Sequence, residues 1–310
     1  MRDLDVNTQN LVLQQTVADH VVMHGTGLHS GAETVLRIHP AKVDNGIVFV
    51  RKDVTDRNNL IPALWDRVVD TQLCTVIGNK DGVTVGTIEH IMAALSALGI
   101  SNAMIELDGP EVPIMDGSSL PFIRAIEAVG VRQQDAPLKV IKILEEITYT
   151  EDDKVVRLMP SDHAEFAITI DFSHQSIGRQ SYALSLDGDS FTNEISDART
   201  FGFAHEVNYL RSLGLCLGGS LENAVVLDEQ KILNPEGLRH NDEFARHKLL
   251  DAVGDIFLAG TRIIGAYDGF KAGHAVNNRA LHALYANPEK WVYTTLAVQE
   301  SPKAAQLATA

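Results

Sequence analysis

The sequence predicts an α+β protein whose two halves follow the same plan. In each half, strand-like segments come first and helices later, instead of alternating with them. A polar stretch that ends in proline, residues 131–137, separates the two patterned halves. The 310 residues, of which 45% are hydrophobic, suffice for one large or two medium domains. We therefore expect domains at residues 11–134 and 138–300, with loose termini at 1–10 and 301–310.

The first half contains three predicted strands and two predicted helices. Apolar and polar side chains alternate, as in strands with one buried face, at residues 34–39, 46–51 and 103–107. Residues 87–98 carry apolar side chains at helical spacing, and Gly99 is a plausible stop. Residues 119–129 predict a second helix, because serines precede it and Gly130 follows it.

The second half repeats this order. Strand-like patterns occur at residues 138–150, 154–158 and 165–172, and in the last of these Phe166, Ile168, Ile170 and Phe172 share one face. A long helix is predicted at residues 242–260, a strand at 262–267 and a final helix at 277–286. The matching order of the two halves indicates an internal pseudo-repeat.

Composition excludes several classes of protein. A net charge of −15 argues against nucleic acid as the main partner, because binding its backbone needs a surplus of Lys and Arg. The two cysteines, Cys74 and Cys216, form no Cys-x-x-Cys pair, which excludes a zinc finger, and a disulfide framework is not expected. The sequence has no secretory signal and no apolar run of membrane-spanning length. We expect a cytoplasmic and monomeric protein, because nothing in the sequence demands an oligomer.

The long helix of the second half carries a candidate metal site. His247, Asp251 and Asp255 are spaced four apart and therefore lie along one helix face. An exposed polar stripe or a simple helical His–Asp pair would show the same spacing. However, Leu249 and Val253 belong to an apolar set that surrounds much of this helix, so the stripe is expected to be partly buried. Buried charges need partners or a metal.

Two further segments could complete such a site. Glu89 and His90 open the first-half helix, and they could supply a third ligand and a carboxylate that is not a ligand, as a hydrolytic metal site requires. His274 lies in a glycine-punctuated loop between a strand and a helix and is a candidate for proton transfer. The alternatives are an adjacent Glu–His pair without a role, and a capping or solvent-exposed histidine.

Other segments are less informative by themselves. Thr200, in the turn-rich segment 197–202, could donate a hydrogen bond to an oxyanion. The glycine-rich stretches 25–31 and 218–220 match neither a dinucleotide-binding nor a phosphate-binding loop. We interpret both as tight turns.

Together these segments resemble one family, the UDP-3-O-acyl-N-acetylglucosamine deacetylases, which are zinc enzymes of the committed step in lipid A synthesis. The matching stretches occur in the family's order over roughly residues 12–290: GLHSG at 27–31, TIEH at 87–90, VPIMDG at 112–117, ARTFGF at 198–203, GLCLGGS at 214–220, DEFARHKLLDAVGD at 242–255 and GH at 273–274.

The resemblance implies a fold of two similar domains, each a β-sheet layered against two helices, with the active site between them. It also implies that a zinc ion is held by His90, His247 and Asp251, although Fe²⁺ could occupy the same ligand set in the cell. By the same resemblance, Glu89 is the general base.

The resemblance assigns further roles around the metal. Thr200 would help to hold the oxyanion, His274 would act as the second acid–base or electrostatic residue, and Asp255 would orient His274. The substrate would be a UDP-3-O-(3-hydroxyacyl)-N-acetylglucosamine, and the products its free amine and acetate. Residues 203–226 would form the acyl-chain passage. The expected substrate contacts are Lys248 and Lys271 at the diphosphate, Phe172 at the uracil, and Phe201 and Cys216.

Two rival interpretations remain at this point. A metal-free binding protein for nucleotide sugars, or a structural dimerisation module with an acidic surface, would also give an acidic α+β chain. Neither needs the combination of Glu89, His90, His247, Asp251 and His274.

Overall fold

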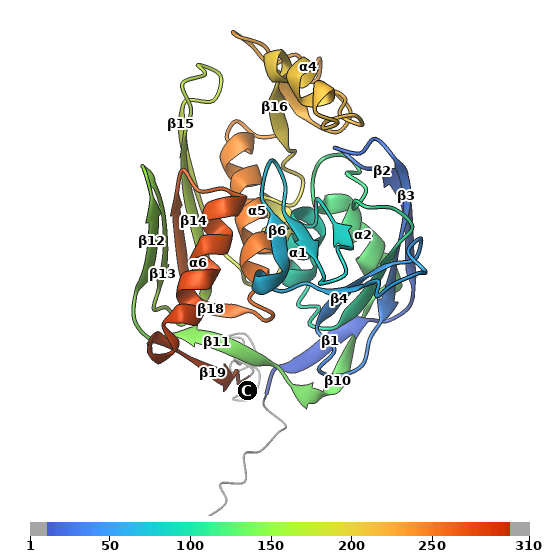
Figure 1. The fold of residues 1–310 in the computed structure, drawn as a ribbon. Coiled ribbons are helices and arrows are strands. Elements are labelled where there is room, and N and C mark those ends of the chain that lie inside the picture. Colours follow the sequence, from blue (N-terminus) through green and yellow to red (C-terminus); the bar gives the residue numbers. More distant parts are fainter. Residues whose placement is uncertain (1–10, 298–310) are drawn as a thin grey trace, which may run out of the picture.

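The computed structural model describes residues 11–297 and confirms the α+β class. Two sheets lie on opposite sides of the molecule, and helices from both halves of the chain are packed between them (Figure 1). The predicted loose ends, 1–10 and 301–310, lie outside the described residues.

The first sheet is built entirely from the first half of the chain. Its five strands follow the order β2 (Val21–Thr26), β3 (Glu33–Pro40), β9 (Ala103–Leu107), β4 (Ile47–Arg51) and β5 (Leu60–Pro62). Strands β4 and β9 run parallel, whereas the other neighbours are antiparallel. The inner layer of this half consists of α1 (Glu89–Ala97) and α2 (Leu120–Val129), close to the predicted bounds.

The second sheet has seven strands from the second half. Its main path is β12 (Ile147–Glu151), β13 (Lys154–Met159), β18 (Ile263–Phe270), β11 (Lys139–Ile143) and β19 (Trp291–Thr295). Strand β14 (Ala164–Asp171) pairs with β18 and with β15 (Arg179–Ser185). Helices α5 (Glu243–Phe257) and α6 (His274–Ala286) cover this sheet.

Shorter elements complete the fold. A small sheet follows β5 and the 3₁₀ turn Trp65–Arg67, and it consists of β6 (Val68–Asp70), β7 (Val76–Gly78) and β8 (Thr84–Val85). A lobe after β15 contains α3 (Ser190–Glu194), β16 (Phe201–Phe203), α4 (Ala204–Ser212) and β17 (Val225–Leu227). A second 3₁₀ turn, Pro288–Lys290, leads into β19.

The chain between the halves differs from the expected elements in two places. Residues 131–137, expected as the polar stretch that separates the halves, form a strand, β10 (Val131–Pro137), which pairs antiparallel with β1 (Leu13–Val17). Residues 138–150 form two strands instead of one, because the chain leaves the sheet after Ile143 and re-enters it at Ile147. Strand β10 is mostly exposed, so it has no apolar alternation to detect.

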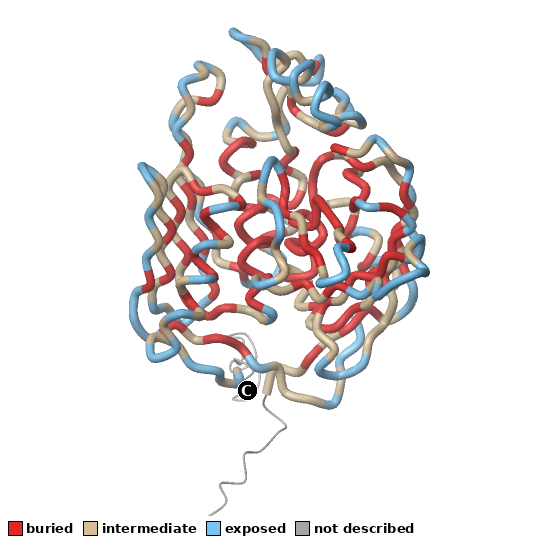
Figure 2. The backbone as a smooth tube through the Cα atoms, in the orientation of Figure 1, coloured by how far each residue is buried: buried red, intermediate tan, exposed pale blue. Residues whose placement is uncertain are grey.

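Helices α1 and α5 cross at the centre of the molecule, where burial is greatest (Figure 2). Gly254 on α5 makes this close crossing possible. A Cβ atom at Gly254 would overlap the carbonyl oxygen of Glu89 on α1. The crossing therefore brings the first turn of α1 against the middle of α5. Within residues 11–297, no helix is long and apolar enough to span a membrane.

Candidate metal centre

The crossing of α1 and α5 brings three potential metal ligands together. His90 is the second residue of α1, while His247 and Asp251 lie one turn apart on α5. One ligand atom from each of the three lies within 4.8 Å of the other two. Asp251 Oδ1 is 3.3 Å from His247 Nε2 and 3.5 Å from His90 Nε2. All three side chains are buried, so the alternative of an exposed polar stripe is wrong.

The chemistry of these side chains fits a divalent metal ion. Asp251 Oδ1, which faces the Nε2 atoms of both histidines, is buried and has no hydrogen-bond partner among the described residues, which is costly unless a cation is bound nearby. His247 Nδ1 lies 3.0 Å from the carbonyl oxygen of Ala198, to which it can donate, so that Nε2 keeps its lone pair toward the cluster. Burial lowers the pKa of His247 to about 3, and the imidazole is therefore neutral, as metal binding requires.

Glu89 faces this cluster without belonging to it. The side chain is buried, and its Oε2 accepts a hydrogen bond from the backbone N–H of Thr75 at 3.0 Å. Its Oε1 is 4.0 Å from His274 Nε2. Burial raises the pKa of Glu89, although electrostatic interactions with His274 and His90 oppose this shift. A carboxylate with a raised pKa is suited to accept a proton near neutral pH.

His274 is held by the third acidic residue of α5. Its Nδ1 is 2.9 Å from Asp255 Oδ2. Burial alone would lower the pKa of His274, but the charges of Asp255 and Glu89 and the hydrogen bond to Asp255 outweigh it and raise the pKa to about 9. His274 therefore carries a proton at neutral pH. The expectation that His274 lies in a loop was wrong: α6 begins at this residue, three positions earlier than its pattern predicts.

Thr200 reaches the site through main-chain contacts. Its N–H donates to the carbonyl of Gly117 at 2.8 Å, and its own carbonyl accepts from the N–H of Val225 at 2.8 Å. Gly117 has a φ of +85°, and a Cβ atom there would overlap the carbonyl oxygen of Asn223. Thr200 lies two residues after Ala198, whose carbonyl oxygen contacts His247. The turn at Gly117, in the first half, therefore fixes the segment 198–200 next to the candidate metal cluster.

Three of the expected substrate contacts lie around His247. The rings of Phe172 and Phe201 are 5.7 Å apart, and the ring of Phe201 is 6.3 Å from that of His247. Lys248 Nζ is 5.7 Å from the centre of the Phe201 ring and 2.7 Å from Asp251 Oδ2. Lys248 is thus partly buried and paired with Asp251 of the candidate metal cluster. Its contact with a diphosphate stays a prediction.

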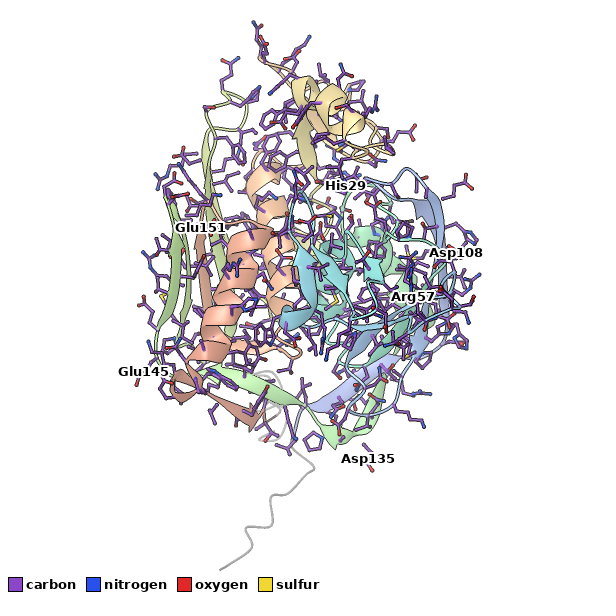
Figure 3. The ribbon with its side chains drawn as sticks, viewed as in Figure 1. His29, Arg57, Asp108, Asp135, Glu145 and Glu151 are labelled. Carbon is purple, nitrogen blue, oxygen red and sulfur yellow. The ribbon has the colours of Figure 1, made fainter. Side chains whose placement is uncertain are left out.

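The other two expected contacts have different surroundings. Lys271 Nζ pairs with Asp153 at 2.9 Å and with Asp171 at 3.4 Å. Cys216 Sγ is 3.9 Å from His29 Nδ1, and His29 lies beneath the lobe that carries α4 (Figure 3). Burial lowers the pKa of His29, Glu111 opposes this shift, and the charge on His274 adds to it.

The two glycine-rich stretches are tight turns, as expected, and they contact each other. The N–H groups of Leu217 and Gly218 donate to the carbonyls of His29 and Leu28, each at 3.1 Å. A Cβ atom at Gly218 would overlap the carbonyl oxygen of Gly27. The first turn is also anchored by Glu111, whose carboxylate accepts from the N–H of His29 at 2.9 Å.

Several buried groups of the site escaped the sequence analysis. Asn277 Nδ2 donates to Asp255 Oδ2 at 2.9 Å, and the hydroxyl of Tyr267 donates to Asn277 Oδ1 at 2.7 Å. Asn277 follows His274 by three residues, so helical spacing would have revealed it if the start of α6 had been placed correctly. Thr75, which contacts both Glu89 and Asp255, has no signal in the sequence.

Comparison with known proteins agrees with this geometry. The model of the UDP-3-O-acyl N-acetylglycosamine deacetylase family matches residues 14–286. A UDP-3-O-acyl-N-acetylglucosamine deacetylase of Phenylobacterium zucineum is 50% identical over 286 residues, covering 92% of this chain and 98% of the relative. Proteins of the same name from Myxococcus xanthus and Shewanella violacea are 49% and 47% identical, over 89% and 91% of this chain and 87% and 92% of the relatives. The chain therefore belongs to the UDP-3-O-acyl-N-acetylglucosamine deacetylase family.

Proposed function

We propose that this protein hydrolyses the N-acetyl group of UDP-3-O-(3-hydroxyacyl)-N-acetylglucosamine, the committed step of lipid A biosynthesis. The observation that carries the proposal is the pairing of a buried His₂Asp cluster with Glu89 and His274, two proton-transfer groups 4.0 Å apart. The names of the relatives supply the UDP-3-O-acyl-N-acetylglucosamine part of the substrate, and the 3-hydroxy group of the acyl chain comes from the family resemblance.

We propose zinc as the resident metal. His90, His247 and Asp251 would hold it, because two imidazoles and one carboxylate are a set typical of catalytic zinc and leave a position for water. Fe²⁺ is the alternative occupant, since the same donors also suit iron. When bound, the metal supplies Lewis acidity and lowers the pKa of a coordinated water.

Glu89 and His274 divide the proton transfers. Glu89 takes a proton from the attacking water, because burial has raised its pKa. The water oxygen bonds to the acetyl carbon, and the amide C–N bond then breaks. His274 is protonated at neutral pH and gives its proton to the leaving amine, so that acetate and a free glucosamine amine result.

The surrounding residues position these groups and bind the substrate. Asp255 fixes the orientation of His274 and keeps it charged. The Thr200 hydroxyl donates to the developing oxyanion. Lys248 and Lys271 contact the diphosphate, Phe172 contacts the uracil, Phe201 is a further substrate contact beside Phe172, and the 203–226 segment with Cys216 receives the acyl chain. Exposed Leu213, Leu217 and Leu221 in that segment support the last assignment.

We also propose the domain boundary expected from the sequence, with domains at 11–134 and 138–300. The pairing of β10 with β1 supports a division near this point, because β10 ends at Pro137, directly before the second domain, and so extends three residues past position 134. A monomeric state and a cytoplasmic location stay predictions of the sequence.

One experiment tests the central proposal. Metal content and deacetylation of a UDP-3-O-acyl-N-acetylglucosamine are measured for the wild-type protein and for His247→Ala. We expect about one zinc per wild-type chain, and loss of both metal and activity in the variant. His163→Ala, in an exposed turn between β13 and β14, is the matched control and should retain both. Full zinc and full activity in His247→Ala would refute the proposal in favour of a metal-free binding protein or a structural module.

A further inference from the structure

Thr75 is a buried polar residue to which neither the family resemblance nor the proposed mechanism assigns a role. It lies just before β7, in the first half of the chain. The preceding residues form a turn in which Leu73 has a φ of +66°. After this turn the chain enters the core, so that Cys74 and Thr75 are both buried.

The backbone of Thr75 anchors the start of α1. Its N–H donates to Glu89 Oε2 at 3.0 Å, and its carbonyl accepts from the N–H of Ile88 at 3.4 Å. The general base therefore has a defined rotamer, with Oε2 held by a main-chain group and Oε1 directed toward His274. These contacts do not depend on the Thr75 side chain.

The side chain of Thr75 crosses to the other half of the molecule. Its hydroxyl donates to Asp255 Oδ1 at 2.6 Å. The other oxygen of Asp255 faces His274 Nδ1 and accepts from Asn277 Nδ2, each at 2.9 Å. Thr75 is thus the one described residue seen to hydrogen-bond Oδ1, and a buried carboxylate held at only one oxygen can turn about its Cβ–Cγ bond.

We propose that Thr75 is a positioning residue that locks Glu89 and the Asp255–His274 pair in one arrangement. The N–H of Thr75 fixes the carboxylate of Glu89, the proposed base. The hydroxyl of Thr75 fixes Asp255, which orients His274, the proposed acid. Because both contacts come from a single residue on the first-half side of the interface, the two proton-transfer groups keep a fixed separation. This inference rests on the proposed function for its kinetic consequence, but its structural part concerns only this chain's own residues.

The test compares Thr75→Val, Thr75→Ser and Thr34→Val. Valine has the shape of threonine but no hydroxyl, whereas serine retains the hydroxyl. Thr34→Val is the matched control, because Thr34 is a buried threonine on β3 whose hydroxyl has no partner among the described residues. The measurements are kcat and KM for deacetylation, zinc content, and the proton NMR signal of the His274 Nδ1–H in metal-free protein.

We expect Thr75→Val to lower kcat about 10–100-fold with KM and zinc content unchanged, as is usual when the partner of an orienting group is removed. The His274 Nδ1–H signal should exchange faster with water in this variant. Thr75→Ser should restore most of the activity and the signal, and Thr34→Val should match the wild type.

Two results would overturn the inference. One is a Thr75→Val protein with wild-type kcat and an unchanged His274 signal. The other is a Thr75→Ser protein as impaired as Thr75→Val, which would mean that packing and not the hydroxyl matters. A wild-type protein inactive on the acetylated substrate would refute the proposed function instead, and the NMR signal of the variants would still decide the role of Thr75.

Discussion

Replacing Asp255 with asparagine should remove most of what keeps His274 charged. In the wild-type protein Asp255 Oδ2 lies 2.9 Å from His274 Nδ1, and its charge is the largest of the influences that raise the pKa of this imidazole, to about 9. A pKa of 9 in place of the usual 6.5 corresponds to a preference of about 3 kcal/mol for the charged form. Asp255→Asn should bring the pKa of His274 toward 6.5 or below, because burial then prevails.

The assay is an NMR titration of the histidine rings in metal-free protein, from pH 5 to 10. The variant Asp268→Asn removes a partly exposed carboxylate that pairs with Arg157, and it should leave the midpoint of His274 in place. A His274 midpoint near 9 in Asp255→Asn, or near 6.5 in the wild-type protein, would refute the reasoning.

The same shift has a consequence for stability. Because the pKa of His274 is higher in the folded than in the unfolded protein, the stabilisation is fully present below about pH 6.5 and is lost as the pH rises through about 9. The stability of the metal-free protein to urea should therefore decrease over this window. In Asp255→Asn the decrease should be much smaller, whatever the absolute stability of the variant.

Three further predictions concern the metal and the core. Removal of metal by a chelator should abolish activity and lower the free energy of unfolding, by about 4 kcal/mol when free metal had been at a thousand times its dissociation constant; an unchanged urea midpoint would argue against a bound metal. Gly254→Ala should destabilise the protein and reduce its zinc content, because the new Cβ overlaps the carbonyl of Glu89; zinc analysis and urea unfolding check this, and a wild-type result for both would contradict the close crossing. Arg199→Met should cost about 3–5 kcal/mol in urea unfolding, because it leaves the completely buried Glu243 without its guanidinium partner; a loss below 1 kcal/mol would contradict this.

Much of the fold could be predicted from residue patterns. The longer helices and the strands with one buried face were found close to their true bounds, because each repeats its pattern over several residues. Three-residue strands such as β7 and β16 are too short to show a period. Strand β10 was not recognised as a strand because most of its side chains are polar, and only its pairing with β1 makes it one.

In the candidate site, too, local contacts could be predicted from the sequence, whereas contacts between the two halves could not. Spacing on one helix predicted that His247 and Asp251 share a face, since 3.6 residues per turn is a local property of the backbone. Spacing could not connect them with Glu89 and His90, which lie in the other half of the chain. That connection came from the family resemblance, and the crossing of α1 and α5 provides its physical basis.

The sequence by itself therefore determined the α+β class, the His–Asp helix face and the family, because these depend on local periodicity and on motifs in a fixed order. Only the tertiary structure decided which oxygen of Asp251 is left without a partner, that Asp255 faces His274, and that Thr75 holds both Glu89 and Asp255. These contacts join residues far apart in the chain. They arise where two helices approach closely enough, at Gly254, for single hydrogen bonds to cross between the halves.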